Sequence, residues 1–289
     1  MNASRSLTLP IAAISALAFT ADATAASLPE RVTFASADGR TTLVGYIFIP
    51  EGPHAARMPA VVMMHGRAGA YSSLAKGKYD ASTLSKRHRQ WGHIWAQQGY
   101  LAILVDGFGP RGYPNGFPRF SYDSRPDELN EVTVRPLDAY GALAYLRTRN
   151  DVIPDRIALQ GWSNGASATM AATATGITTP PTPSTGFRAG LAFYPACGLK
   201  GQFAEGIKPY APVRVFHGSA DEETSPRRCA ELVAKSQAIG GDIQFQLYRG
   251  ATHGFDDPSP SHQSDEANAY ATRDATARAI AFFAGVLKP

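Results

Sequence analysis

The amino-acid sequence predicts a single α/β domain whose mainly parallel sheet is covered by helices on both faces. Six runs of nearly continuous apolar character alternate with segments that suit helices, which is the composition of buried parallel strands. The chain has 289 residues, of which 44% are hydrophobic and 18% charged, enough to bury a substantial core. No internal repeat and no second-domain boundary is visible in the sequence.

The first 25 residues differ in kind from the rest. Arg5 precedes a 13-residue apolar stretch, Leu7 to Phe19, and small residues follow up to Ala25, as in a secretory signal peptide. The alternative, a membrane anchor, needs roughly 20 apolar residues. We therefore expect residues 1–25 to be a signal peptide and residues 26–289 to be one mature domain. The protein is expected to be secreted, with the bacterial periplasm as its destination and no attachment to the membrane after cleavage.

The first two strands are expected to be antiparallel. The runs RVTFAS and TTLVGYIFIP flank Asp38 and Gly39, a favourable hairpin turn. The six strands that follow are expected at PAVVMMHG, YLAILVDG, RIALQGW, GLAFYPA, VRVFHG and IQFQLYRG, each covered on both faces. Helices are expected at residues 86–98, 132–149, 164–175, 226–239 and about 265–287. This alternation predicts a doubly wound sheet.

Three connections are longer than a compact α/β domain requires: residues 67–85, 110–131 and the Thr/Pro-rich stretch 175–187. The first two follow the carboxyl ends of strands, where open α/β sheets place their functional sites. They are therefore candidate walls of a pocket. The third has the composition of a solvated surface connector.

The segment GWSNG, residues 161–165, matches the pattern G-x-S-x-G. A predicted strand precedes it and a helix rich in small residues follows, as the nucleophile elbow requires. In that sharp turn the backbones approach so closely that a Cβ atom at Gly161 or Gly165 would clash. Ser163 is thus the candidate nucleophile, and it needs a base and an acid to activate it.

Histidine is the expected base. The elbow topology has the chain order serine, acid, histidine, which leaves His217, His253 and His262. His253 lies just beyond the last predicted strand and before the terminal helix, and we take it as the base. His217 ends a strand and is expected to be structural, whereas His262 lies in a Ser/Pro-rich stretch and is expected to be solvated.

Asp221 is the best candidate for the acid that orients His253, since it lies on the loop after a strand end. Its neighbours Glu222 and Glu223 are expected to be solvent-facing charges near the start of a helix, where carboxylates also favour the helix dipole. Asp256 and Asp257 follow His253 too closely to serve as the separate orienting group.

An acyl-transfer site also needs two backbone N–H donors for the oxyanion. Asn164, the residue after the nucleophile, is one expected donor, and Arg67 is the other, with Ala68 as the alternative. The Arg67 side chain could attract an anionic substrate, or it could be exposed or locally ion-paired.

The substrate pocket is predicted from aromatic and charged residues near these loops. For one of them, Trp162, packing in the core is an alternative to substrate contact. For another, Arg111, an ion pair with Asp106 that braces the loop is the favoured alternative. The expected substrate-binding residues are Trp162, Tyr71, Phe108, Arg111 and Tyr113.

The sequence contains two cysteines, Cys197 and Cys229. Export to an oxidising compartment permits a disulfide. If the strands before these two residues are neighbours in the sheet, a bridge would fix the loop that carries Asp221. We expect this disulfide; the alternative is two separate buried thiols.

These segments together resemble the dienelactone hydrolase family of α/β-hydrolases. The resemblance covers nearly the whole mature sequence, through MMHGRAG, WAQQGYLAILVDGFGPRG, RPLDAYGALAYLR, LQGWSNGAS, YPACG, FHGSADEETSP and THGFD. It implies the α/β-hydrolase fold without a separate cap domain, and hydrolysis of carboxylic esters without a cofactor. The namesake enzymes carry cysteine at the elbow, so Ser163 makes this chain more similar to the esterase-type members than to those that cleave dienelactone.

Other classes of function are disfavoured. The net charge is +4, but the basic residues are scattered and form no stripe interleaved with aromatic residues, which argues against nucleic-acid binding. No metal site is expected, and the expected partner is a small-molecule ester. Two rivals stay open: a serine peptidase of the prolyl-oligopeptidase type, which shares the order of the triad but has an N-terminal propeller, and a secreted binding protein that kept the fold and lost turnover.

Overall fold

A computed structural model describes residues 27–175 and 185–288. The predicted signal peptide lies outside the described residues, and so does most of the Thr/Pro-rich connector. Within the described ranges, no helix combines the length and the apolar character needed to cross a membrane.

The structure is one eight-stranded sheet with the strand order β1-β2-β4-β3-β5-β6-β7-β8. Strands β1 and β2 form the predicted antiparallel hairpin, and β2 also pairs antiparallel with β4. All later neighbours in the sheet pair in parallel. The strands are β1 Glu30–Ala35, β2 Thr42–Phe48, β3 Met58–Met64, β4 Leu101–Asp106, β5 Val152–Trp162, β6 Gly190–Phe193, β7 Val213–Gly218 and β8 Ile243–Tyr248. The predicted fold class is therefore confirmed.

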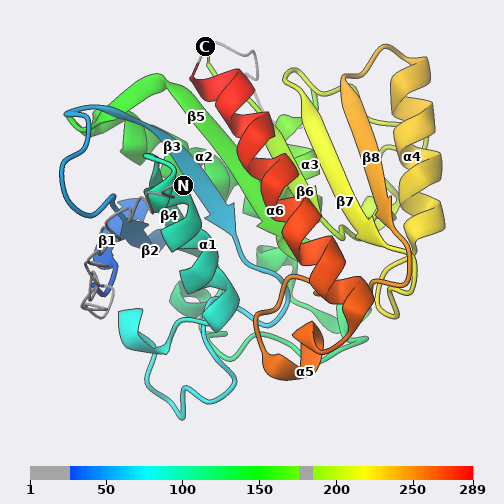
Figure 1. The fold of residues 1–289 in the computed structure, drawn as a ribbon, viewed down its shortest axis with the longest axis horizontal. Helices are drawn as coiled ribbons and strands as arrows, with labels where there is room; N and C mark the ends of the chain where they lie inside the picture. Colours follow the sequence, from blue (N-terminus) through cyan, green and yellow to red (C-terminus); the bar gives the residue numbers. More distant parts are fainter. Residues whose placement is uncertain (1–26, 176–184, 289) are drawn as a thin grey trace, which may run out of the picture.

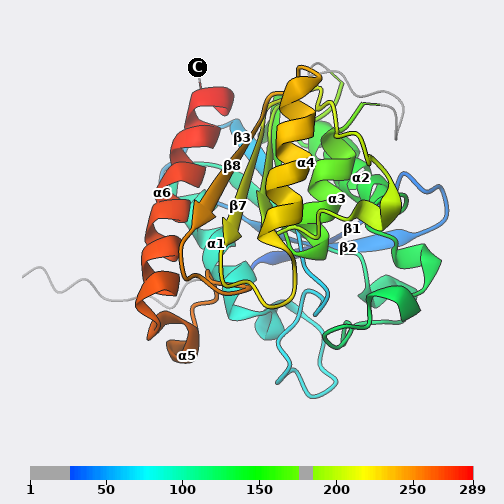
Figure 2. The ribbon, with the colours of Figure 1, turned by 90° about the vertical axis from the view of Figure 1, so that its right-hand side faces the viewer.

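Helices cover both faces of this sheet, with α6 on one side and α3 and α4 on the other (Figures 1 and 2). The alternation of side chains along β3 explains the two layers, because Val61 and Met63 pack with the tryptophans of α1, while Val62 and Met64 pack with the leucines of α2. The helices are α1 Lys86–Gln97, α2 Arg135–Thr148, α3 Asn164–Thr173, α4 Pro226–Ala238, α5 Pro260–Gln263 and α6 Glu266–Leu287.

Two expectations about these elements need correction. Strand β8 is not buried on both faces: Leu247 is 45% exposed because β8 forms the edge of the sheet. Helix α2 begins at Arg135 rather than at residue 132, since the Asn130 side chain accepts hydrogen bonds from the N–H groups of Val132 and Thr133 and holds them in a turn.

The two long loops that the sequence marks as pocket walls contain no domain of their own. Both lie wholly within the described residues, and their only helical pieces are short 3₁₀ turns, at Ala81–Thr83, Gly109–Arg111, Tyr122–Ser124 and Asp127–Leu129. They follow β3 and β4 and run along the edge of the sheet where the parallel strands end.

Candidate active site

Ser163 lies in a strained turn between β5 and α3, with φ +52° and ψ −117°. A positive φ is rare for a residue with a Cβ atom and persists only where the surroundings enforce it. Here they do: a Cβ at Gly161 would lie 2.1 Å from the carbonyl oxygen of Gly165, and a Cβ at Gly165 would lie 2.0 Å from that of Met64. The predicted clash at both glycines is confirmed, and the turn presents Ser163 at the carboxyl end of β5.

Asp221 and His253 meet at the same edge of the sheet. The loops after β7 and β8 carry them, and His253 Nδ1 lies 2.8 Å from Asp221 Oδ2. Burial alone would raise the pKa of Asp221, but the hydrogen bonds from His253 and from the N–H of Thr224 bring it below its usual value. An ionised Asp221 accepts the Nδ1 proton, which leaves Nε2 as the acceptor nitrogen of the ring.

Two further contacts hold His253 in place. Its backbone N–H donates to Glu222 Oε2 at 3.0 Å, and the ring packs edge-on against Tyr194 with 4.7 Å between centroids. Nε2 lies 3.8 Å from Glu223 Oε2, and no hydrogen bond joins it to the Ser163 hydroxyl in the part of the chain that the structure describes. Asp221 and His253 are thus paired, and Ser163 lies on the turn after β5 at the same edge of the sheet.

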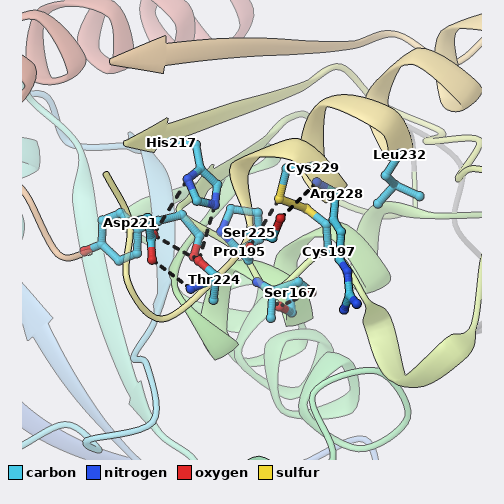
Figure 3. Close-up of a disulfide and its surroundings, with 12 residues drawn as sticks. Ser167, Pro195, Cys197, His217, Asp221, Thr224, Ser225, Arg228, Cys229 and Leu232 are labelled. Atoms are coloured by element: carbon cyan, nitrogen blue, oxygen red, sulfur yellow. Dashed lines mark hydrogen bonds and ion pairs between the residues drawn. A yellow bond between two sulfur atoms is a disulfide. The ribbon is translucent and has the colours of Figure 1, made fainter. Parts of the chain in front are cut away.

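The other two candidate histidines have different surroundings. His217 is fully buried at the end of β7, where burial lowers its pKa. Its Nδ1 lies 3.7 Å from Asp221 Oδ2 and its Nε2 lies 3.3 Å from the Thr224 hydroxyl, so it packs against the loop that carries Asp221 (Figure 3). His262 is half-buried rather than solvated, because its Nδ1 bonds with the Ser259 hydroxyl beside α5.

Both expected oxyanion donors lie beside the nucleophile. A Cβ at Gly66 would be 3.3 Å from Ser163 Cβ, so the loop that carries Arg67 runs directly against the elbow. Asn164 is the first residue of α3, and its N–H therefore has no intrahelical acceptor and lies at the positive end of the helix dipole. Arg67, Ser163 and Asn164 line one cavity.

The Arg67 side chain is ion-paired. Its Nε and Nη2 donate to the two carboxylate oxygens of Glu223 at 2.7 and 2.8 Å. Arg119 donates to the same carboxylate at 2.7 Å. The expectation that Glu223 faces solvent is therefore wrong: its side chain is 8% exposed, because two guanidinium groups draw it inward. Burial would raise the pKa of Glu223, but the bonds from Arg67 lower it overall.

The cavity in front of Ser163 has a volume of about 450 Å³ and a highly charged lining. Both loops predicted as walls contribute to the lining: the first supplies Arg67, and the second supplies residues that the sequence did not single out, Phe120, Tyr122, Asp123 and Arg125. No group of three or more His, Cys, Asp or Glu side chains suited to a metal ion occurs in the described ranges. The charged residues of the lining are Arg67, Arg125, Lys200, Arg228, Asp123 and Glu223.

Trp162, expected to contact substrate, packs in the core instead. It is fully buried, and its Nε1 donates to Asp256 Oδ2 at 2.8 Å. Asp256 also accepts from Trp91 Nε1 at 2.8 Å and from the Tyr194 hydroxyl at 2.5 Å, and it pairs with Arg87 at 3.2 Å. The sequence did not reveal this buried carboxylate, which joins the elbow strand, α1 and the end of β6 beneath the site.

The other four expected substrate contacts also lie away from the cavity lining, each for a local reason. The Tyr71 hydroxyl donates to Asp106 at 2.9 Å, Phe108 packs on His65 with 4.5 Å between centroids, and Tyr113 packs on Phe117. Arg111 does not pair with Asp106 as expected: it binds Asp38 and Asp138 at 2.8 Å, which lie closer to its guanidinium.

A disulfide joins Cys197, which follows β6, to Cys229 in α4 (Figure 3). The strands before them, β6 and β7, are neighbours, as the prediction required. Cys197 lines the cavity. Helix α4 begins at Pro226, directly after the loop that carries Asp221 and Thr224, and Figure 3 shows these two residues together with the disulfide. The bridge therefore ties one wall of the cavity to the helix that follows the acid loop.

Comparisons with known proteins agree with this architecture. The model of the dienelactone hydrolase family matches residues 43–287. A dienelactone hydrolase-like promiscuous phosphotriesterase from metagenomic libraries superposes with a TM-score of 0.64 at 18% identity, covering 89% of this chain and 97% of its own. Esterase 2 of Thermogutta terrifontis, in its apo form, gives a TM-score of 0.61 at 18% identity over 91% of this chain and 97% of its own. No curated protein matches the sequence.

Proposed function

Since this chain belongs to the dienelactone hydrolase family, we propose that it is a serine hydrolase that cleaves small carboxylic esters through Ser163, His253 and Asp221. One observation carries the proposal: an Asp221–His253 hydrogen bond of 2.8 Å lies at the same edge of the sheet as a serine held in a nucleophile elbow.

The first half of the reaction forms an acyl-enzyme. Substrate binding brings the Ser163 hydroxyl into hydrogen-bond range of His253 Nε2, as catalytic hydrogen bonds often tighten in the Michaelis complex. His253 takes the hydroxyl proton, Ser163 Oγ attacks the ester carbonyl, and the N–H groups of Arg67 and Asn164 stabilise the oxyanion. The alcohol leaves with the proton from His253.

The second half releases the acid. His253 takes a proton from water, the hydroxide attacks the acyl carbonyl, and Ser163 leaves with that proton. Asp221 holds the reactive tautomer of His253 throughout and stabilises the imidazolium form. No cofactor takes part in this scheme.

The cavity favours a short and polar substrate. A volume of about 450 Å³ limits the length of the acyl chain, and the six charged side chains of the lining favour a substrate with polar groups. A structure of Thermogutta terrifontis esterase 2 holds butyrate, which supports short acyl groups in this fold. We further propose that the protein is exported, because its first 25 residues have the pattern of a signal peptide.

A panel of p-nitrophenyl esters, run on the wild type, Ser163→Ala and the exposed control Ser261→Ala, tests the proposal. Removal of the nucleophile is expected to lower kcat by roughly 10⁶-fold, while the control keeps the wild-type rate. Mass spectrometry after reaction with a fluorophosphonate should place the adduct on Ser163. Turnover that survives Ser163→Ala overturns the assignment. Faster cleavage of peptide anilides than of esters would favour the peptidase, and ester binding without turnover would favour the binding protein.

A further inference from the structure

One short segment of the long loop after β4 contacts both residues that the proposed oxyanion hole uses. We call Phe117 to Arg125 the brace. At one end, the Phe117 N–H donates to the Arg67 carbonyl oxygen at 2.8 Å, and Arg67 Nη1 donates back to the Phe117 carbonyl oxygen at 3.0 Å. At the other end, Arg125 Nη1 donates to Asn164 Oδ1 at 2.6 Å.

The two ends of the brace are also joined to each other. The Arg125 guanidinium lies over the ring of Phe117 at 5.7 Å and over that of Tyr122 at 5.4 Å. Just before the brace, Gly116 packs directly against the backbone of the Arg67 loop, because a Cβ atom at this position would lie 2.5 Å from the Arg67 carbonyl oxygen. A displacement of Arg125 is therefore transmitted to Phe117 and to the Arg67 loop.

The brace reaches the acid loop as well. Arg119 donates to Glu223 at 2.7 Å, on the same carboxylate that binds Arg67. A single segment thus touches the loop after β3, the loop after β7 and the first residue of α3. These three pieces of chain carry the amides and the acid of the proposed mechanism.

Two arginines of the cavity lining, Arg125 and Arg228, have no carboxylate within ion-pair distance among the described residues. Of these two, Arg228 is exposed, whereas Arg125 is partly buried and bound to Asn164. Burial, with a further contribution from Arg67, lowers the pKa of Arg125 to about 10, so it keeps its charge at neutral pH. Its bond to the neutral Asn164 amide is therefore charge-assisted, which makes it shorter and stronger than a neutral one.

We propose that Arg125 is a positioning residue of the oxyanion hole: it holds Asn164 directly and the Arg67 loop through Phe117, so that both amides face the developing negative charge. The inference rests on the proposed function. Loss of one oxyanion donor costs about 10²–10³-fold in kcat. Removing the support of the donors should cost less, roughly tenfold.

The test compares Arg125→Met with Arg228→Met. Both remove a guanidinium from the lining of the cavity, but no contact joins Arg228 to Arg67 or Asn164 in the described part of the chain. Arg125→Met is expected to lower kcat about tenfold with KM changed less than about threefold, because preorganised donors act on the transition state. Arg228→Met is expected to affect KM more than kcat. Equal losses of kcat in the two variants would assign the effect to cavity charge and overturn the positioning role.

A double-mutant cycle with Asn164→Ala identifies the route. This change removes Oδ1 and keeps the backbone N–H. Because Arg125 is proposed to act both through the Asn164 side chain and through Phe117, the double variant should lose more activity than either single variant but less than the product of the two losses. Fully multiplicative losses would contradict the proposed action through Asn164.

Amide NMR spectra keep the inference testable without turnover. In Arg125→Met the backbone amide resonances of both Arg67 and Asn164 should shift relative to the wild type, and in Arg228→Met they should not. Unchanged resonances would overturn the inference even if Ser163→Ala abolishes hydrolysis. Shifted resonances in a protein whose hydrolysis survives Ser163→Ala would instead support the brace and reject the proposed function.

Discussion

Loss of the Cys197–Cys229 disulfide is expected to destabilise the fold and disturb one wall of the cavity. The two cysteines are 32 residues apart in the chain. In the chain-entropy treatment, a crosslink that closes a loop of this length lowers the entropy of the unfolded state by about 12 cal/mol/K. This corresponds to a stabilisation of about 4 kcal/mol at 25 °C. With an unfolding entropy of about 2 cal/mol/K per residue, this lowers the Tm of a domain of this size by roughly 7 °C.

The assay is thermal unfolding followed by circular dichroism, on the wild type with and without reductant and on the double variant Cys197→Ser/Cys229→Ser. The double variant should melt at the temperature of the reduced wild type and should not respond to reductant. Its KM for short esters should rise, because Cys197 lines the cavity. Two thiols that react with an alkylating agent before reduction, or a loss of less than about 1 kcal/mol in the double variant, would refute the reasoning.

Four further outcomes are expected. Asp256→Asn should lower the free energy of unfolding by about 1–3 kcal/mol in urea titrations, because the buried site loses its charged acceptor while Arg87 keeps its ion pair with Asp257 at 3.1 Å. Gly165→Ala should give no cooperatively folded protein by near-UV circular dichroism, since its Cβ would lie 2.0 Å from a carbonyl oxygen. Glu223→Gln should cost about 1.5–3 kcal/mol at pH 7. The pKa of Glu223 is lower in the folded protein than its usual 4.5. The difference in free energy of unfolding between the wild type and this variant should therefore have its full size above pH 4.5 and disappear as the pH falls through the folded-state pKa. Urea midpoints of both proteins at pH 7 and 3 would show this loss. Esters of acetate and butyrate should have a higher kcat/KM than palmitate in the p-nitrophenyl assay, and the reverse order would contradict the polar cavity.

The strands, the main helices and the elbow could be predicted because neighbouring residues encode them. Alternation along β3 sets which side chains face each layer of helices. Gly161 and Gly165, on either side of Ser163, permit the close backbone contacts of the elbow because they lack a Cβ atom. The order of strand ends along the chain indicates which loops share an edge, and it therefore predicts that Asp221 and His253 meet, as their distance of 2.8 Å confirms. The edge position of β8 was missed, because strand order in a sheet is not a property of the strand's own residues.

The side chains that line the cavity could not be predicted from the sequence, because their directions depend on contacts between distant segments. Trp162 turned into the core because a buried carboxylate at Asp256, 94 residues further along the chain, accepts its N–H. Glu223 turned inward because Arg67, 156 residues before it, offers two donors. A polar side chain is buried only where a distant partner compensates the loss of its hydration, so its direction depends on which segments the fold brings together. The sequence by itself determined the fold class and the loops that meet at one edge of the sheet, while only the tertiary structure decided which side chains of those loops face the nucleophile.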